Sequence, residues 1–579
     1  MAEHPAPLRR IPTGSAAGTA PQWQRPAVSE TNVSRPPQPQ SPPPEPAAPQ
    51  ERRGTRWHFV VFGTLLGLLT VGVIGIGAAF AFRTLLGHED RATAAYAPAD
   101  SYAYIAINTD RRSQAWLDAW NMARDLGLDD DLAELPKEAA RQAGLDPSLW
   151  EEPLRPAIGD EVGVAVWPTA GATSEPHMAL LVQIGDGAAA EAAIPVLLED
   201  DAPVAATYRG VTYYTGAANA SAAGIIDDVL AFTSSVAAFE QVVDARRDGA
   251  LDQVAAFTTA AERAAASPLL FAYIDTTAIG ALVDDALAEN VPTDLPAEAF
   301  QLEEWGQVTI TLKAEDNALR LSSRSSARPA ASPDFGSGAR LDAFSNEMPA
   351  NLFMLLAGHD LYATVWQPIS EQMAQLNDAL GDSGEMGSAA MLDMVSMVGF
   401  DLDGGFFGQM RGDYALGAAL SGVGTVSGAD VRFFAHVDDP AVVAATLAEM
   451  ADMVALSGVP LEHDANGFSL STAGVEAVVR LEGDTLRMIV SYQSEGATTG
   501  TLAADPTFRR AVDALPETSG FAGYVAFHPL MALLPPGELA DLDPQARALL
   551  EALSAMAFSA GNDGDGMRGD ILLLFNAGE

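Results

Sequence analysis

Short apolar runs alternate with polar turns along most of residues 92–330, which is the pattern of β-strands. Neighbouring runs are often separated by only a few polar residues, as at Ala314-Glu315-Asp316-Asn317, and such neighbours are expected to form antiparallel hairpins. The runs predict strands at residues 102–108, 162–167, 178–184, 211–214, 229–233, 269–274, 308–313 and 318–323.

Helical spacing interrupts the strands at corresponding places in the two halves of the chain. After Asp186, apolar residues recur at 190, 194 and 197, and after Asp439 they recur at 443, 447 and 450. Each Asp can accept hydrogen bonds from the free amides of the first helical turn. A third apolar stripe, at Phe508, Ala511, Val512 and Leu515, predicts a helix near the C-terminus.

The landmarks of the first half return in the same order at a nearly constant shift of 251 to 255 residues. The pairs are Ala97-Pro98-Ala99 with Met348-Pro349-Ala350, Gly144-Leu145-Asp146 with Gly399-Phe400-Asp401, Gly159-Asp160 with Gly412-Asp413, Phe257 with Phe508, and Tyr273 with Tyr524. We therefore predict two homologous repeats, 92–330 and 344–579, joined by a linker at 331–343. Each repeat is expected to be an α+β domain, a mostly antiparallel sheet backed by helices on one face.

A stretch without any Asp, Glu, Lys or Arg runs from Trp57 to Phe82. As a helix it would measure roughly 39 Å at about 1.5 Å per residue, which exceeds the roughly 30 Å apolar layer of a bilayer. The sequence thus predicts a single transmembrane helix, followed by a juxtamembrane linker at 83–91. A cleaved signal peptide is the alternative, but its apolar core would be only about 7–15 residues long.

The residues before this stretch are rich in proline, with 13 Pro among residues 1–56 and overlapping P-x-x-P spacings. Such a segment buries almost nothing and is expected to be a disordered tail. A solvated linker is the simpler interpretation, and docking to a partner domain is the alternative. The full expected fold is therefore a disordered tail and one transmembrane helix, followed by the tandem duplication.

Charge orients the chain across the membrane. The formal net charge is −45, yet residues 1–56 hold seven Arg and four Glu, a net of +3, which leaves −48 for the rest. Arg52, Arg53 and Arg56 precede the apolar stretch, which indicates a cytoplasmic N-terminus and an extracytoplasmic bulk at the plasma membrane. The acidic bulk would repel the phosphates of nucleic acid, so the charge argues against a DNA- or RNA-binding protein. The absence of Cys excludes disulfides and thiolate chemistry.

Catalytic constellations were sought and none was recognised. The eight His have no pair at metal-ligand spacing, and Lys137 and Lys313 are the two lysines of the bulk. Gly381-Asp382-Ser383-Gly384 reads like the segment around a serine-protease nucleophile, but it has no recognisable His segment to act with. We therefore assign no catalytic, cofactor-binding or metal-binding residue, and expect a protein that is not an enzyme and has no cofactor.

Acidic clusters are the remaining candidates, for calcium. Asn562-Asp563-Gly564-Asp565-Gly566 offers oxygen donors but lacks EF-hand spacing, and its counterpart in the first repeat is the turn at Asp316-Asn317. A hairpin turn is therefore favoured over an ion site. Asp401-Leu402-Asp403-Gly404-Gly405 is similarly open to both interpretations. Runs at 129–131 and 199–201 are typical of solvated helix ends.

One segment resembles a known family. Ala97-Pro98-Ala99-Asp100-Ser101-Tyr102 leads into an apolar strand that ends at Ile107-Asn108-Thr109-Asp110, just after the apolar stretch. This arrangement resembles the bacterial domain-of-unknown-function 3352 family. The second copy keeps Pro349-Ala350 and has Asn351 where the first has Asp100. The resemblance implies a bacterial envelope protein and carries over no activity.

The sequence thus favours a single-pass bacterial membrane protein whose duplicated outer part is a non-enzymatic binding or scaffolding module. Two related sheets would create a cleft or an extended face, where an envelope protein, peptide or lipid could bind. The alternatives are a cofactor-free envelope hydrolase that uses paired carboxylates and a transmembrane relay through the Pro-rich tail. Nucleic acid is not an expected partner.

Overall fold

The structure is a computed structural model of the 579-residue chain, which divides into two units, 1–56 and 57–579. The predicted tail, the predicted span Trp57–Phe82 and Ser383 all lie outside the residues it describes. The described residues belong to the second unit and are 91–126, 150–169, 176–198, 202–216, 221–264, 268–280, 302–315, 317–328, 338, 340–367, 406–421, 428–456, 458–472, 474–492, 500–516, 520–532 and 544–576.

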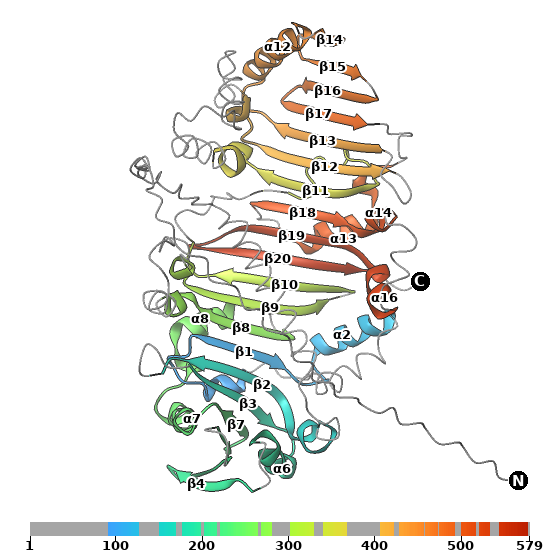
Figure 1. Ribbon diagram of the computed structural model, residues 1–579. Helices are drawn as coiled ribbons and strands as arrows, with labels where there is room; N and C mark the ends of the chain where they lie inside the picture. Colours follow the sequence, from blue (N-terminus) through green and yellow to red (C-terminus); the bar gives the residue numbers. More distant parts are fainter. Residues whose placement is uncertain are drawn as a thin grey trace, which may run out of the picture. The chain divides into compact units, whose positions relative to one another are not determined.

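The second unit contains one antiparallel sheet of 20 strands (Figure 1). From one edge to the other, the pairing order among the described strands is β4-β5-β6-β7-β3-β2-β1-β8-β9-β10-β20-β19-β18-β11-β12-β13-β17-β16-β15-β14. In the first half the bounds are β1 Ala103–Asn108, β2 Ile158–Trp167, β3 His177–Ile184, β4 Val204–Tyr208, β5 Val211–Thr215, β6 Ala222–Ile226, β7 Val229–Thr233, β8 Leu270–Asp275, β9 Gln307–Glu315 and β10 Ala318–Ser325. In the second half they are β11 Leu352–His359, β12 Asp413–Ser421, β13 Gly428–His436, β14 Leu461–Asp464, β15 Gly467–Thr472, β16 Val475–Glu482, β17 Thr485–Tyr492, β18 Phe521–Ala526, β19 Leu553–Asp563 and β20 Gly566–Phe575.

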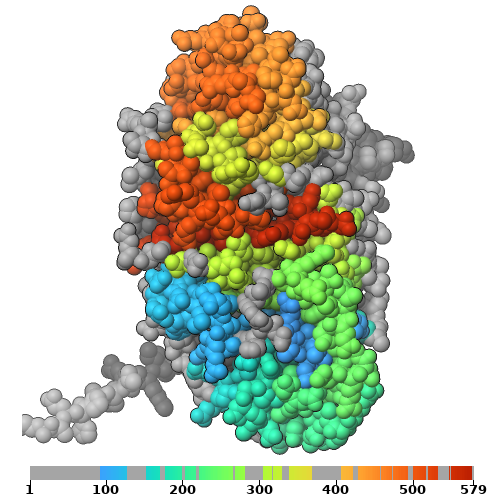
Figure 2. Space-filling view, turned by 180° about the vertical axis from the view of Figure 1, so that it is seen from behind, coloured from blue at the N-terminus to red at the C-terminus, as the bar shows by residue number. Residues whose placement is uncertain are grey.

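The strand order repeats within the sheet. Strands β1 to β10 and strands β11 to β20 follow the same spatial sequence, so each strand has a counterpart ten numbers away. The two halves meet at the seam β10–β20, where Ala318 lies opposite Leu574 and Arg324 opposite Arg568. In Figures 1 and 2 the red C-terminal strand accordingly lies beside the yellow-green end of the first half.

The predicted fold class is wrong. Two α+β domains, each with its own sheet, were expected behind a transmembrane helix, whereas a single antiparallel sheet runs through both halves. The physical reason is that an edge strand presents unpaired backbone N–H and C=O groups, and pairing β10 with β20 satisfies both edges at once. The described residues contain no helix that is long and apolar enough to cross a membrane.

Helices cover both faces of the sheet. We call the face that carries Tyr104, Tyr273 and Tyr524 face A, and the opposite face, with Ile107 and Leu321, face B. The longer helices are α2 Gln114–Asp125, α6 Gly187–Leu198, α7 Val236–Asp248, α8 Ala255–Arg263, α12 Pro440–Leu456, α13 Pro506–Ala514 and α16 Pro544–Ala552. The short ones are η1 Ala92–Ala95, η2 Trp150–Leu154, α5 Arg155–Ala157, η3 Leu251–Gln253, η5 Leu302–Trp305, η6 Tyr362–Trp366, η8 Phe407–Gln409, η9 Leu502–Ala504 and α14 Phe527–Met531.

The apolar stripes of the sequence account for where these helices pack. On face B, α6 buries Ile194 in the first half and α12 buries Val443 and Leu447 in the second. On face A, α7 buries Phe239 in the first half, and α13 buries Phe508 beside Tyr524. The predicted caps are present, since Asp186 accepts from the amide of Ala189 at 3.0 Å and Asp439 from that of Ala441 at 3.0 Å.

Candidate binding pocket in the second repeat

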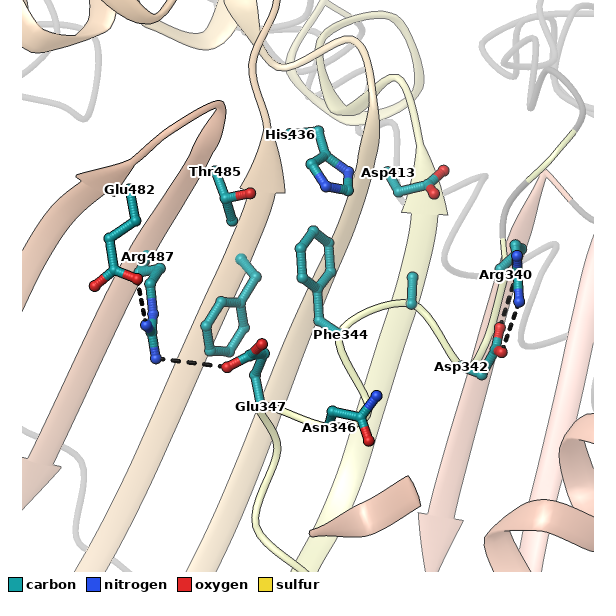
Figure 3. Close-up of a pocket in the computed structure, with 12 residues that line it drawn as sticks. Arg340, Asp342, Phe344, Asn346, Glu347, Asp413, His436, Glu482, Thr485 and Arg487 are labelled. Carbon is teal, nitrogen blue, oxygen red and sulfur yellow. Dashed lines mark hydrogen bonds and ion pairs between the residues drawn. The ribbon is translucent and has the colours of Figure 1, made fainter. Parts of the chain in front are cut away.

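A polar pocket of about 420 Å³ lies on face A of the second repeat (Figure 3). Its base consists of strand residues from β12, β13, β16 and β17, and residues 340–347 form one side before the chain enters β11. The lining residues are Arg340, Asp342, Ala343, Phe344, Asn346, Glu347, Asp413, Phe434, His436, Glu482, Thr485 and Arg487.

Aromatic rings form the middle of the pocket. The ring of Phe344 stacks on Phe434, with centroids 5.5 Å apart and planes at 17°, and lies 4.8 Å from the ring of His436. Phe344 has a φ of 59°, which is uncommon for a residue with a side chain. The contacts of the Phe344 ring with Phe434 and His436 hold the backbone in this conformation. The Phe344 ring therefore forms a fixed wall of the pocket.

Ion pairs stand on both sides of the rings. Arg487 lies between two carboxylates, with Nη1 at 2.6 Å from Glu482 and Nη2 at 3.6 Å from Glu347, while its guanidinium carbon lies 5.5 Å from the centroid of Phe434. Across the pocket, Arg340 donates to both oxygens of Asp342, at 3.0 and 2.8 Å (Figure 3). The lining therefore contains four carboxylates, two guanidiniums and one imidazole.

A fourth carboxylate, that of Asp413, is held from the neighbouring strand. His359 Nδ1 and Asp413 Oδ1 are 2.9 Å apart, and the two residues lie opposite each other in the β11–β12 ladder. His359 does not line the pocket itself, and it contacts the lining through the Asp413 carboxylate. All four lining carboxylates thus contact a cationic or ionisable nitrogen.

The same region of the first repeat is closed. The residue that matches Glu347 is Tyr96, which is 3% exposed and donates its hydroxyl to Asp228 at 2.8 Å. Apolar residues match the others: Leu181 takes the place of Phe434, Ala231 of Arg487, Ile226 of Glu482 and Val229 of Thr485, all buried in one core. The pocket exists because polar and charged residues stand where the first repeat has close-packed apolar ones.

The matched carboxylates show the same contrast. Glu161 lies opposite Asn108 just as Asp413 lies opposite His359, and Glu161 is buried, accepting from the Thr93 amide at 2.9 Å and the Thr93 hydroxyl at 2.6 Å. The Tyr104 hydroxyl adds a third bond at 3.2 Å. Burial raises the pKa of Glu161, and the bonds from Thr93 oppose that rise. In the second repeat Phe344 replaces Thr93, so no hydroxyl closes over Asp413.

Helix α7 is the second part of the closure in the first repeat. It packs on β3, β6 and β7, with Phe239 against Tyr213 at 5.1 Å between centroids. Residues 234–249 connect β7 to the bridge between Pro98 and Ala250 and include α7. The matching connection, from β17 to the bridge between Pro349 and Thr501, has only residues 493–500, which is shorter than α7 itself.

The sequence candidates for chemistry do not meet at this pocket. Asn562–Gly566 is the turn between β19 and β20, as its counterpart beside Asn317 is the turn between β9 and β10. Among the described residues no group of three or more His, Asp or Glu is placed to hold a metal ion. The runs 129–131, 199–201 and 401–405 lie outside the described residues. Lys313 pairs with Glu315 at 3.2 Å, far along the sheet at β9.

The pocket residues were missed by motif reasoning because they form no motif. Glu347, Glu482 and Arg487 come from three separate segments and meet only through the strand register. An alignment of the two repeats could have indicated the pocket, because charged residues of the second repeat match apolar residues of the first. That alignment also needed a correction of one residue, because the register matches Asp413 with Glu161 rather than with Asp160.

Comparison with known proteins gives a family. A family model described as "Protein of unknown function (DUF3352)" matches residues 64–467, which is most of the chain. The chain belongs to the DUF3352 family. The match confirms the resemblance seen in the Ala97–Asp110 segment, and it ends before the pocket residues Glu482, Thr485 and Arg487. No curated protein matches the chain.

Solved structures of TP0453 show a distant similarity to this DUF3352 protein. Crystal form I shares 11% identity at a TM-score of 0.22, covering 41% of this chain and 79% of that one. Crystal form IV shares 11% identity at a TM-score of 0.23, covering 45% and 86%. TM-scores this low do not establish a shared fold.

Three of the four carboxylates that line the pocket of this DUF3352 chain are held in ion pairs with arginine. A carboxylate pair that works as acid and base needs two groups in different environments, one of them free to give up a proton. Here Glu347 and Glu482 share the same guanidinium, and Asp342 is held by both nitrogens of Arg340. The arrangement presents fixed charges and an aromatic surface to whatever enters.

Proposed function

We propose that the protein is a non-enzymatic binding module, and that the pocket on face A of the second repeat receives its ligand. The observation that carries this proposal is the contrast between the repeats. The first repeat closes this region with Tyr96, apolar strand residues and α7, while the second has Glu347, Glu482 and Arg487 there. Charged residues that replace a core at a matched position favour a site that contacts something outside the chain.

The energetics support recognition over a purely structural role. Side chains of Glu347 and Glu482 are 46% and 52% exposed, so their ion pairs with Arg487 are screened by water. Exposed pairs of this kind contribute only about 0–1 kcal/mol to stability. A fold that used this region for stability would gain more from the apolar residues found in the first repeat.

The test is to close the pocket with residues of the first repeat. The double variant Glu347→Tyr, Arg487→Ala introduces the residues found at 96 and 231, and a photo-crosslinking amino acid at Thr485 reports what enters. We expect envelope adducts at 485 that disappear in the double variant. The control is Arg547→Ala, which removes an arginine of α16 that pairs with Glu551 at 3.8 Å and lies outside the pocket.

Adducts that persist in the closed variant would contradict the proposal, because the label would then report contacts outside the pocket. The absence of any adduct in cells that contain the full envelope would contradict it as well. The thermal midpoint of each variant checks that the loss of adducts is not a loss of folding.

We also propose that the module works on the extracytoplasmic side of the plasma membrane, attached through the uncharged stretch Trp57–Phe82. The support is in the sequence alone: Arg52, Arg53 and Arg56 on one side of that stretch and a strongly acidic chain on the other. Reporter fusions at residue 50 and after residue 579 test it. A reporter active only in the cytoplasm should work at the first site, and one active only outside at the second; the reverse would contradict the proposal.

A further inference from the structure

We infer that the pocket takes a cationic group, the ammonium or guanidinium of a Lys or Arg side chain on a polypeptide partner. This inference rests on the proposed function and names the chemistry of the ligand. It is carried by three features of the described residues: the balance of charge in the pocket, the aromatic stack between the charges, and the acidic sheet face that continues beyond it.

The charge balance of the lining is negative. Asp342, Glu347, Asp413 and Glu482 face Arg340 and Arg487, so two negative charges are in excess when His436 is neutral. An anionic ligand in the pocket would be repelled by the carboxylates that surround both arginines. A cation can instead bind beside the existing pairs, because a carboxylate has more acceptor positions than one guanidinium fills.

The aromatic stack suits the stem of a long cationic side chain. Phe344 and His436 lie between the Arg487 pairs on one side and the Arg340–Asp342 pair on the other (Figure 3). Lys and Arg place their methylene stems along apolar surfaces while the charged head remains at the polar rim. A cation near an aromatic ring gains further attraction from the ring face.

The same face of the sheet continues the acidic character toward its edge. The ladders place Asp430, Glu476, Glu462 and Asp464 on this face together with Arg432 and Arg480. Arg432 pairs with Asp430 at 3.0 Å and Arg480 with Asp464 at 3.1 Å, which leaves the carboxylates in excess. A partner with several basic residues would meet complementary charge along this face, so a polypeptide fits better than a small amine.

The experiment measures fluorescence anisotropy of labelled peptides with the full-length chain. Three peptides of equal length are compared: oligolysine, oligoglutamate and a neutral Ser/Gly peptide. We expect oligolysine to bind, and Asp413→Asn and the double variant Glu347→Gln, Glu482→Gln each to weaken it by roughly tenfold, the usual loss when a charge-assisted contact is removed.

The matched control is Glu551→Gln, on α16 away from the pocket, which removes a carboxylate paired with Arg547 at 3.8 Å. This control matters because a chain of net charge −45 attracts oligolysine everywhere. Glu551→Gln should leave the affinity unchanged within about twofold, since one screened surface charge contributes little.

Three outcomes would overturn the inference. If Glu551→Gln weakens oligolysine as much as the pocket variants do, or if oligolysine does not bind, the pocket does not select cations. If oligoglutamate binds and Arg487→Gln abolishes that binding, the ligand class is wrong while the pocket remains a binding site. The crosslinking experiment at Thr485 uses no peptide probe, so failure of the proposed function is seen there independently.

Discussion

Ser322 and Asp570 face each other across the seam that joins the two halves of the sheet. The hydroxyl of Ser322 donates to Asp570 Oδ1 at 2.5 Å, and the carboxylate of Asp570 is completely buried. Arg568 Nε lies 2.7 Å from Oδ2 of Asp570, and Arg320 Nη1 lies 3.8 Å from Oδ1. A buried carboxylate with these partners ties three strand residues from both halves to one point.

Removing this carboxylate should destabilise the protein strongly. In Asp570→Ala, Arg568 and Arg320 lose a buried partner, and removal of one member of a buried charge network costs about 3–5 kcal/mol. We expect a large fall in the thermal midpoint. The control Asp563→Ala removes a half-exposed partner of Arg324 and should change stability by less than about 1 kcal/mol. Equal effects in the two variants would show that the seam does not depend on Asp570.

The sequence predicts which residues form strands better than it predicts which strands pair with each other. The predicted runs at 229–233 and 318–323 coincide with β7 and most of β10, because alternation marks a strand wherever it lies. Alternation does not indicate which strands lie side by side, so the sequence does not predict the seam between β10 and β20. Strand β4, whose residues are largely exposed, was missed because it has no clear alternation to detect.

Because face A is closed in the first repeat and open in the second, truncation of an apolar side chain should destabilise the first repeat more than the second. Phe239 on α7 is fully buried and rests over Gly224, where an added Cβ would lie 2.8 Å from the ring. Phe239→Ala should cost about 3–5 kcal/mol, the usual cost of emptying an aromatic core position. Chemical denaturation of the full chain measures the loss.

The matched variant is Ile489→Ala on β17, at the position that corresponds to Thr233 on β7. Ile489 is partly exposed on face A, so we expect a loss of less than about 1.5 kcal/mol. A loss as large as that of Phe239→Ala would mean that this face of the second repeat is as tightly packed as the first, against the description of the pocket as open.

The comparison of the two repeats at the candidate site depends on an alignment offset of one residue near Asp413, which the sequence alone does not determine. The ladders β1–β2 and β11–β12 match Asp413 with Glu161, one residue after the Gly159-Asp160 sequence match, and β2 is irregular here, between Ile158 and Val162. Since side chains alternate between faces, a shift of one residue exchanges face A for face B. The sequence match therefore pairs Asp413 with Asp160 instead of Glu161, the buried residue at the equivalent position of the ladder.

Glu161 predicts a pH dependence of the protein's stability. Burial raises the pKa of Glu161 above its ordinary value of about 4.3, although Thr93 opposes the rise. The neutral form is therefore favoured by folding, and the stability it contributes is present at low pH and lost as the pH rises through the raised pKa. Arg91 interacts electrostatically with Tyr104 and Glu161, and burial lowers the pKa of its guanidinium.

The variant Glu161→Gln keeps an acceptor for Thr93 and removes the titration. We expect its stability relative to the natural protein to increase as the pH is raised from about 4 to 7, measured as the difference between their denaturation midpoints. The control Gln253→Ala removes an exposed side chain that does not titrate and should give a constant difference. A constant difference for Glu161→Gln too would contradict the expected titration.

Calcium should have no effect on the turn between β19 and β20. Two of its oxygen donors already contact arginines: Arg328 donates to Asn562 Oδ1 at 3.2 Å, and Arg324 lies 3.5 Å from Asp563 Oδ2. A calcium ion needs six to eight oxygens around it, and guanidiniums beside the donors repel a divalent cation. We expect the thermal midpoint to be the same in millimolar calcium and in excess chelator. A midpoint that rises with calcium and loses that rise in Asp563→Asn would show that the turn is an ion site.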